Sequence, residues 1–430
     1  MKKMKLNIPI YLMLVVFIMA CNQKRKEEIM PTTKKVSAKD ILGNPDYLAI
    51  SYGGYRKKSR DSQPTIPQLK EDMKILSAMG IKVLRTYNVQ PKLPHASNVL
   101  KAISELKAED PNFEMYVMLG AWIDCLNAWT DKAPNHDIES PNNEGEINRA
   151  VALANKYPDI VKVIAVGNEA MVKWATSYYV QPDVILKWVN YLQDLKAEGK
   201  LSKDLWITSS DDFSSWGGGD SKYHVEALDE LIKAVDYISM HTYPYHNTHY
   251  NPEFWGVPDA HKDVPDITKI EMAMERSIKF SKRQYDSVTN YMKSIGANKP
   301  VHIGETGWAS ISNGHYGNNG SRATDEYKEG LFHQQMREWT NRAGISCFYF
   351  EAFNERWKDA RNSKGSENHF GLFTLEGKAK YAIWDLVDKG IFEGLTRGGK
   401  PITKTYNGDK EELMKDVLVP PTKEEIMATH

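Results

Sequence analysis

Two glutamates, each placed directly after a short apolar run, are the residues of this sequence best suited to chemistry. Glu305 lies in the segment IGETGW at 303–308, and Glu169 ends the segment VGNE at 166–169. Acid-assisted cleavage of a glycosidic bond needs such a pair: one ionised carboxylate that attacks the anomeric carbon and one protonated carboxyl that donates to the leaving oxygen. We predict Glu305 as the nucleophile and Glu169 as the acid/base. The alternative is that both are structural ion-pair acids.

Neighbouring polar and aromatic residues fit a sugar substrate. Asn168 adjoins Glu169 and offers a donor and an acceptor to a sugar 2-hydroxyl, although a turn residue is the alternative. Aromatic rings can stack on the apolar C–H faces of sugars. Several tryptophans fall near predicted strand ends, and Trp308 is the one we expect to act as a sugar platform; the others are Trp122, Trp129, Trp174, Trp216, Trp255 and Trp357.

Other catalytic chemistries find little support in the sequence. His241, His302 and His369 are expected to be structural histidines, and His302 to face the helices. No Cys/His spacing suggests zinc, so we predict no metal site and no cofactor. Cys125 and Cys347 lie in or beside apolar runs, which favours buried, inert thiols.

The length and charge of the chain limit which folds and which partners are possible. The chain has 430 residues, with 56 basic and 56 acidic side chains and 41% hydrophobic residues, enough for one large core. Because there is no basic stripe, we expect no nucleic-acid partner, and a neutral substrate fits better. We expect a monomer.

Eight short apolar runs alternate with amphipathic segments, which must position these residues. The predicted strands are 47–52, 83–87, 114–119, 161–166, 206–209, 237–241, 301–304 and 346–352. Helical periodicity falls between them, for example over 69–79, 147–154, 182–198, 268–295 and 324–342.

Eight strands separated by crossover helices predict an α/β fold, a single (β/α)8 TIM barrel. An open doubly wound sheet is the alternative, but no strand is followed by a glycine-rich phosphate loop. Active sites of barrels lie at the carboxyl ends of the strands. The residues expected to face one cleft are Tyr87, Trp122, Asn168, Glu169, Tyr243, Glu305, Trp308 and Glu355.

The two ends of the chain have separate signatures. Basic residues, a short apolar run and then Cys21 are typical of a bacterial signal with a lipidated cysteine, although an ordinary signal cleaved elsewhere is the alternative. We therefore expect a signal peptide at 1–20, a polar tether at 21–44 after lipidation of Cys21, the barrel at 45–393 and a tail at 394–430, packed on the barrel or partly disordered. The localisation predicted is the cell envelope, with a lipid anchor in the outer membrane.

Six motifs and a closing segment follow one another along the predicted barrel: Tyr52-Gly53, GIKVLRTY at 80–87, VGNE at 166–169, YPY at 243–245, ETGW at 305–308, FNERWK at 353–358 and ENHFGLF at 367–373. In this order they resemble glycoside hydrolase family 17, the β-1,3-glucanases. The resemblance covers about 47–384 and departs at Ala309-Ser310, where plant members usually have Pro-Ser, and in the loops 121–143 and 245–266.

The resemblance implies roles for residues around the two glutamates. Tyr243 would donate its hydroxyl to Glu305, and Tyr52 and Tyr87 would lie near the cleaved sugar. Charged positions behind the pair would be Glu355, Lys358 and Glu367, which could tune a pKa or form a structural salt-bridge cluster.

The function implied is retaining endo-hydrolysis of β-1,3-glucans such as laminarin. A glucanosyltransferase or an exo-acting glucosidase on the same site is the rival among enzymes. A surface glycan-binding lipoprotein without catalysis is the rival from another class, which the presence of both carboxylates disfavours.

Overall fold

The computed structural model describes residues 36–428, which form one compact unit. The predicted signal peptide, the lipidated Cys21 and most of the predicted tether lie outside the described residues. No helix within 36–428 is long and apolar enough to cross a membrane.

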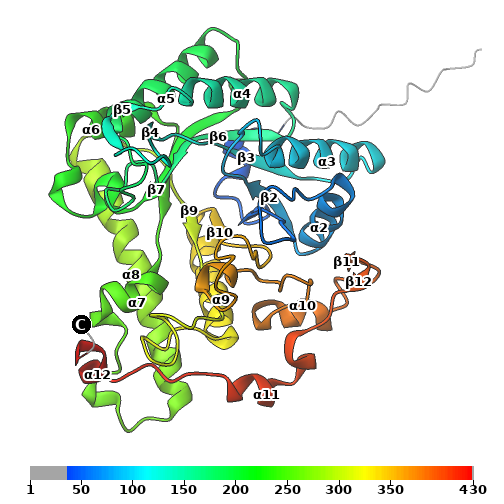
Figure 1. Cartoon of the computed structure of the whole chain (residues 1–430), viewed down its shortest axis with the longest axis vertical. Helices are drawn as coiled ribbons and strands as arrows, with labels where there is room; N and C mark the ends of the chain where they lie inside the picture. The colour runs from blue at the N-terminus through cyan, green and yellow to red at the C-terminus, as the bar shows by residue number, and fades with distance from the viewer. Residues whose placement is uncertain (1–35, 429–430) are drawn as a thin grey trace, which may run out of the picture. The chain divides into compact units, whose positions relative to one another are not determined.

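Eight parallel strands close into a barrel, which confirms the predicted fold (Figure 1). Around the barrel the strands follow the order β1-β10-β9-β8-β7-β6-β3-β2, so every strand lies beside its neighbours in sequence among the eight. The strands are β1 (Leu48–Ser51), β2 (Ile81–Arg85), β3 (Tyr116–Ala121), β6 (Val161–Asn168), β7 (Trp206–Asp212), β8 (Ile238–His241), β9 (Val301–Thr306) and β10 (Cys347–Tyr349).

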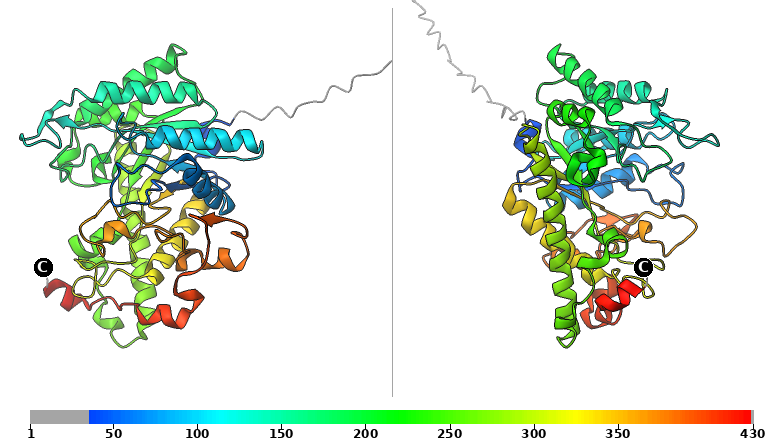
Figure 2. Two further views of the ribbon diagram at one scale, coloured as in Figure 1. Left: turned by 45° about the vertical axis from the view of Figure 1, so that its right-hand side comes forward. Right: turned by 90° about the vertical axis from the view of Figure 1, so that its left-hand side faces the viewer.

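Amphipathic helices cover the outside of the barrel. In the first of them Thr65 and Gln68 form a capping box, and Leu69, Met73 and Leu76 are buried on one face. Figure 2 shows α8, the longest helix, running along one side of the barrel. The main helices are α2 (Ile66–Ala78), α3 (His95–Glu109), α4 (Asn143–Lys156), α5 (Pro182–Ala197), α6 (Glu226–Ala234), α8 (Asp266–Ser294) and α9 (Glu326–Ala343).

The amino end of the barrel is closed by α1 (Ala38–Ile41), which corrects the predicted extent of the tether. Ala38, Ile41 and Leu42 are buried in a cluster with residues of β1, β2, β3, β6 and β10. The helix is tied to segments just before strands: the Ala38 N–H donates to the Asp204 carbonyl at 3.0 Å. Residues 36–44 are therefore part of the fold rather than of a polar linker. This segment is too short and too mixed in composition to show the hydrophobic periodicity of a helix.

The segment 394–428 packs on the barrel as a strap. It contains β11 (Thr396–Arg397), β12 (Lys400–Pro401), α11 (Lys410–Lys415) and α12 (Lys423–Ala428), and it follows α10 (Trp384–Asp388). Figure 1 shows the strap running from the neighbourhood of α2 to that of α7 (Pro244–Tyr250). Arg397 pairs with Asp72 of α2, and Thr422 forms a β-bridge with Val257.

The loop after β3 carries an antiparallel hairpin of its own, β4 (Cys125–Leu126) and β5 (Asn135–Glu139). Cys125 and Cys347 are both buried and free, as the sequence predicted. The hairpin stands at the carboxyl end of the barrel, where the site lies.

Candidate active site

A cleft of about 580 Å³ opens at the carboxyl ends of the barrel strands. Segments that follow β1, β2, β3 and β10 contribute to its walls, together with Asn168 at the end of β6 and Glu305 of β9. Five of the eight residues expected to face one cleft line it: Tyr87, Trp122, Asn168, Glu305 and Glu355.

Glu305 is held by three donors. Tyr243 donates its hydroxyl to Oε1 at 2.6 Å, the contact implied by the resemblance, and Tyr87 donates to Oε2 at 2.8 Å. The Arg85 guanidinium also donates to Oε2. Burial alone would raise the pKa of Glu305, but Arg85, His241 and the two tyrosine hydroxyls outweigh burial and lower it to about 2. Glu305 is therefore ionised at neutral pH.

Glu169 sits where β6 ends in an unusual backbone. Gly167 has φ +82° and Glu169 itself has φ +46°, and its N–H donates to the Ser210 carbonyl at 2.9 Å. These dihedrals turn the chain out of the strand, which costs energy for a non-glycine residue. Burial, followed by the negative charge of Glu305, raises the pKa of Glu169 well above its usual value. Glu169 is therefore the carboxyl that keeps its proton.

The two carboxyl groups lie close together. One carboxylate oxygen of each glutamate falls within 4.8 Å of the other. This short separation fits direct attack by one carboxylate on a sugar whose leaving oxygen is protonated by the other, and it is shorter than the roughly 6.5–9.5 Å between the carboxyl groups of inverting sites.

His241, which the sequence suggested to be structural, contacts the predicted acid/base. Its Nδ1 lies 3.0 Å from Glu169 Oε1, and its Nε2 lies 2.8 Å from the Ser210 hydroxyl, which in turn lies 2.9 Å from the Ser239 hydroxyl. Burial lowers the pKa of His241 to about 4, so the ring is neutral. A neutral imidazole can donate or accept at Nδ1, so this contact suits both protonation states of Glu169. The other two histidines contact neither glutamate.

Gly304 makes room for this chain of hydrogen bonds. A Cβ at position 304 would lie 2.1 Å from the Ser239 hydroxyl and 2.6 Å from the Ser210 hydroxyl. Only glycine fits there, immediately before Glu305.

Arg85 is a site residue that sequence reasoning missed. It is buried at the end of β2 and donates both to Glu305 and to the Asn168 Oδ1 atom. The amide oxygen of Asn168 is thus occupied, which leaves its NH2 group for a sugar hydroxyl. A charged residue at the last position of a buried strand was the available signal.

A buried charged cluster forms the wall beside β10. Lys358 Nζ lies 2.5 Å from Glu351 and 3.7 Å from Glu355, and all three line the cleft with Glu367. Burial raises the pKa of Glu351 to about 8, although Lys358 opposes the shift. Sequence reasoning found Lys358, Glu355 and Glu367 but missed Glu351, because it lies within the predicted strand 346–352.

One predicted sugar platform is corrected by the structure. Trp308 is fully buried, where it packs on Trp255 and donates its indole N–H to the Ala323 carbonyl at 2.8 Å, so it cannot act as a platform. Its side chain turns from the cleft into the core, a choice that residue type does not reveal. Tyr52 does line the cleft, and its hydroxyl donates to buried Asp72 at 3.1 Å.

The group Glu169, His241 and Glu305 is compact enough to resemble a metal site. Its donors are already committed, however, since Glu305 accepts from Arg85 and two tyrosines and His241 contacts Ser210. A cation would also lie against the guanidinium of Arg85. The arrangement suits carboxylate chemistry better than metal binding.

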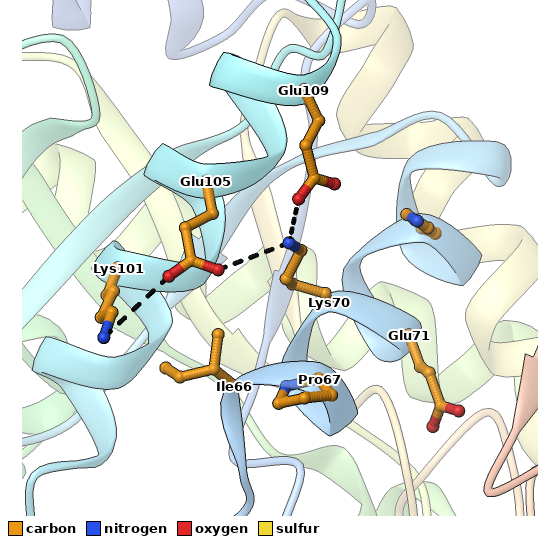
Figure 3. Close-up of a pocket in the computed structure, with 8 residues that line it drawn as sticks. Ile66, Pro67, Lys70, Glu71, Lys101, Glu105 and Glu109 are labelled. Carbon is orange, nitrogen blue, oxygen red and sulfur yellow. Dashed lines mark hydrogen bonds and ion pairs between the residues drawn. The ribbon is translucent and has the colours of Figure 1, made fainter.

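A second hollow of about 430 Å³ lies outside the barrel, between α2 and α3 (Figure 3). Lys70 stands between Glu105 and Glu109, and Lys101 faces Glu105. The charges compensate one another within the groove, and none of the catalytic candidates reaches it.

Comparison with known proteins agrees with the fold and identifies the family. Residues 49–371 match the model of the BtgE/BtgC glycoside hydrolase domain. The crystal structure of an endo-laminarinase from Formosa is 70% identical, with a TM-score of 0.89, and the match covers 90% of this chain and 98% of that one. A glycoside hydrolase family 17 β-1,3-glucanosyltransferase from Rhizomucor miehei shares the fold at 21% identity and a TM-score of 0.53, over 78% of this chain and 96% of that one.

Curated relatives are more distant. A probable glucan endo-1,3-beta-glucosidase btgC of Aspergillus flavus is 24% identical over 83% of this chain and 48% of its own length. A glucan 1,3-beta-glucosidase of Arthroderma benhamiae is 26% identical over 73% of this chain and 82% of its own. The chain spans about half the length of the btgC relatives that it matches.

Proposed function

Because this chain belongs to the BtgE/BtgC glycoside hydrolase family, we propose that it cleaves internal β-1,3-glucosidic bonds of a glucan such as laminarin, with retention of configuration. The chain is a glycoside hydrolase, and the 70% identical relative is an endo-laminarinase. The observation that carries the proposal is the pair Glu169 and Glu305, which lie within 4.8 Å of each other with pKa values displaced in opposite directions. We place the chain in glycoside hydrolase family 17 on its ordered motifs.

The first step uses both carboxyl groups. Ionised Glu305 attacks the anomeric carbon while Glu169 gives its proton to the leaving oxygen, so the bond to the leaving sugar breaks and a glycosyl ester forms on Glu305. Arg85 and the hydroxyls of Tyr87 and Tyr243 keep Glu305 ionised and aimed. The NH2 group of Asn168 can hold the sugar 2-hydroxyl.

The second step reverses the role of Glu169. Once Glu305 is esterified its negative charge is gone, and one cause of the raised pKa of Glu169 disappears with it. Glu169 can then take a proton from water as the water attacks the ester, and the ester bond breaks to release the sugar and restore Glu305.

Time-resolved product analysis tests the proposal. The 36–430 protein is incubated with linear and branched β-1,3-glucans, with Glu305→Gln as the inactive control. Mixed short oligomers early in the reaction support endo-hydrolysis. Glucose alone would instead indicate an exo-acting glucosidase, and products longer than the substrate would indicate transfer.

We also propose that the chain is lipid-anchored through Cys21 in the outer membrane, on the support of the sequence motif alone. Cys21→Ala should move the protein from the membrane to the soluble fraction and leave glucanase activity intact, since anchor and cleft are separate elements. Unchanged fractionation of this variant would refute lipidation at Cys21.

A further inference from the structure

Trp129 is the most exposed large aromatic residue near the cleft. It lies in the hairpin loop between β4 and β5, the relative accessible surface of the residue is 64%, and its φ of +62° falls in the left-handed region. A bulky residue in this region is a genuine outlier, and an exposed indole forgoes the burial that normally stabilises it. Trp129 thus combines an unfavourable backbone conformation with an exposed apolar ring, although a small polar residue would be less costly at this position of the loop.

The loop holds this conformation through its own hydrogen bonds. Asn127, which also has a positive φ of 66°, donates from Nδ2 to the Ala133 carbonyl at 3.1 Å. The Thr130 hydroxyl donates to the Asn127 carbonyl at 2.8 Å and accepts from the Lys132 N–H at 3.2 Å. The hydrogen bonds of Asn127 and Thr130, on either side of Trp129 in the loop, therefore fix its backbone.

Two further rings support the indole from below. Trp129 stacks on Tyr178 with centroids 5.1 Å apart and planes 22° apart, and Tyr178 contacts Trp122 at 5.2 Å. Trp122 is itself oriented, because its indole N–H donates to Asp124 at 3.2 Å. One face of the Trp129 ring is thus backed by protein while much of the ring remains accessible.

This aromatic stack continues the catalytic cleft. Trp122 and Trp129 line the same cavity as Glu305 and Asn168, and Asn88 and Gln90 line it too. Apolar ring faces bordered by amides are the surface that binds the C–H faces and hydroxyls of a neutral sugar.

We propose that Trp129, backed by Tyr178 and Trp122, is a sugar platform that binds a glucose unit of the glucan chain away from the scissile bond. The inference deepens the proposed function and rests on it. The occupant is a stretch of the substrate itself, because the stack opens into the cleft that holds Glu305 and its three rings present uncharged faces. The platform makes affinity depend on chain length, since only a chain long enough to reach Trp129 gains the contact.

The test compares Trp129→Ala with Tyr191→Ala, a matched control that removes an exposed ring from the outer face of α5. KM and kcat are measured on β-1,3-gluco-oligosaccharides of increasing length and on a short aryl glycoside. Trp129→Ala should raise KM about tenfold on long chains, leave kcat within about twofold, and not change kcat/KM on the short substrate. Trp129→Phe should recover part of the affinity, because it keeps a ring in place.

Direct binding separates this inference from the proposed function. In the inactive Glu305→Gln background, calorimetric titration with long oligosaccharides should show the same loss of affinity when Trp129 is replaced. Equal KM and equal affinity for Trp129→Ala and the parent on every chain length would overturn the platform while leaving glucan hydrolysis standing. If the wild-type protein cleaves no β-1,3-glucan yet binds the oligosaccharides through Trp129, the proposed function fails and the platform survives.

Discussion

Burial of Glu169 beside Glu305 makes the proton on one carboxyl depend on the charge of the other. The pKa of Glu169 is raised first by burial and second by the Glu305 charge, whereas Arg85 opposes the rise. Activity should therefore be lost as pH rises through the raised pKa of Glu169, because the leaving oxygen then has no proton donor. Glu305→Gln removes the second cause, so the pKa of Glu169 should fall. Carbon-13 NMR titration of glutamate-labelled protein measures this, and an unchanged or higher pKa in the variant would contradict the coupling.

The two carboxylates should also differ when each is removed. Glu169→Ala should lower activity on natural glucans about 10²–10⁴-fold, since proton transfer is lost, and lower it far less on a substrate whose leaving group needs no proton. Azide should restore turnover of that variant and yield a β-glucosyl azide, because two inversions give retention. Glu305→Ala should be inactive on both substrates. Azide rescue of Glu305→Ala instead would reverse the assignments.

His241 positions Glu169 but takes no part in the formation or the hydrolysis of the glycosyl ester. His241→Ala removes a hydrogen bond to Oε1 and disconnects Ser210, so kcat should fall about tenfold or more on substrates that need protonation and less on activated ones. His302→Ala is the matched control, because His302 is also a buried barrel histidine, but it accepts from the Ser346 N–H instead. Equal leaving-group dependence in both variants would show that His241 only supports the fold.

Sequence reasoning at the residue scale succeeded where position along a strand decides direction. Glu169, Glu305, Asn168 and Tyr87 come at or just after strand ends, so a barrel brings them together. It failed where a side chain beyond the strand chooses between cleft and core, as for Trp308. Arg85 and Glu351 were missed because a charged residue inside a predicted strand signals that it has a polar partner but does not identify that partner.

At the scale of elements, hydrophobic periodicity was enough for the barrel strands and the long helices. α5 was predicted at 182–198 and spans Pro182–Ala197, and α8 was predicted at 268–295 and spans Asp266–Ser294. Pro182 and the apolar face of each helix explain this agreement. The four-residue helix α1 and the two-residue strands β4 and β11 are too short for periodicity to be seen, and long-range contacts hold them.

The helix α1 should stabilise the barrel without taking part in the chemistry. Ile41 is 1% exposed and packs in the cluster that closes the amino end, opposite the cleft. Ile41→Ala should lower the free energy of unfolding by about 2–5 kcal/mol. Chemical denaturation measures this, with exposed Lys39→Ala as the control. Activity per folded molecule should stay at the wild-type level. A loss of activity without a loss of stability would contradict a purely stabilising role for α1.

At the scale of the whole molecule, the strap links a late segment of the chain to the early helix α2. Asp72 of α2 is fully buried and accepts from Arg397 of the strap at 2.9 Å, from Arg56 of the β1–α2 loop at 2.9 Å and from the Tyr52 hydroxyl at 3.1 Å. The contact between Asp72 and Arg397 joins residues 325 positions apart. Sequence reasoning treated this segment as a tail without a clear core face, because its buried residues are few and widely spaced.

Asp72 should be the residue on which the strap depends. Asp72→Ala leaves two buried guanidinium groups without their shared carboxylate, and it should lower the free energy of unfolding by about 3–5 kcal/mol. Arg397→Met should cost less, because Asp72 keeps Arg56 and Tyr52. A double-mutant cycle on the two residues, measured by chemical denaturation, should give a coupling of about 1–3 kcal/mol. The same cycle on the exposed pair Asp385 and Lys389 should give a coupling near zero, since water screens that pair. If the coupling energy between Asp72 and Arg397 is as small as that of the exposed pair, the strap is held by its apolar contacts alone. The kcat of Arg397→Met should match the wild type in either case, because Arg397 does not line the cleft.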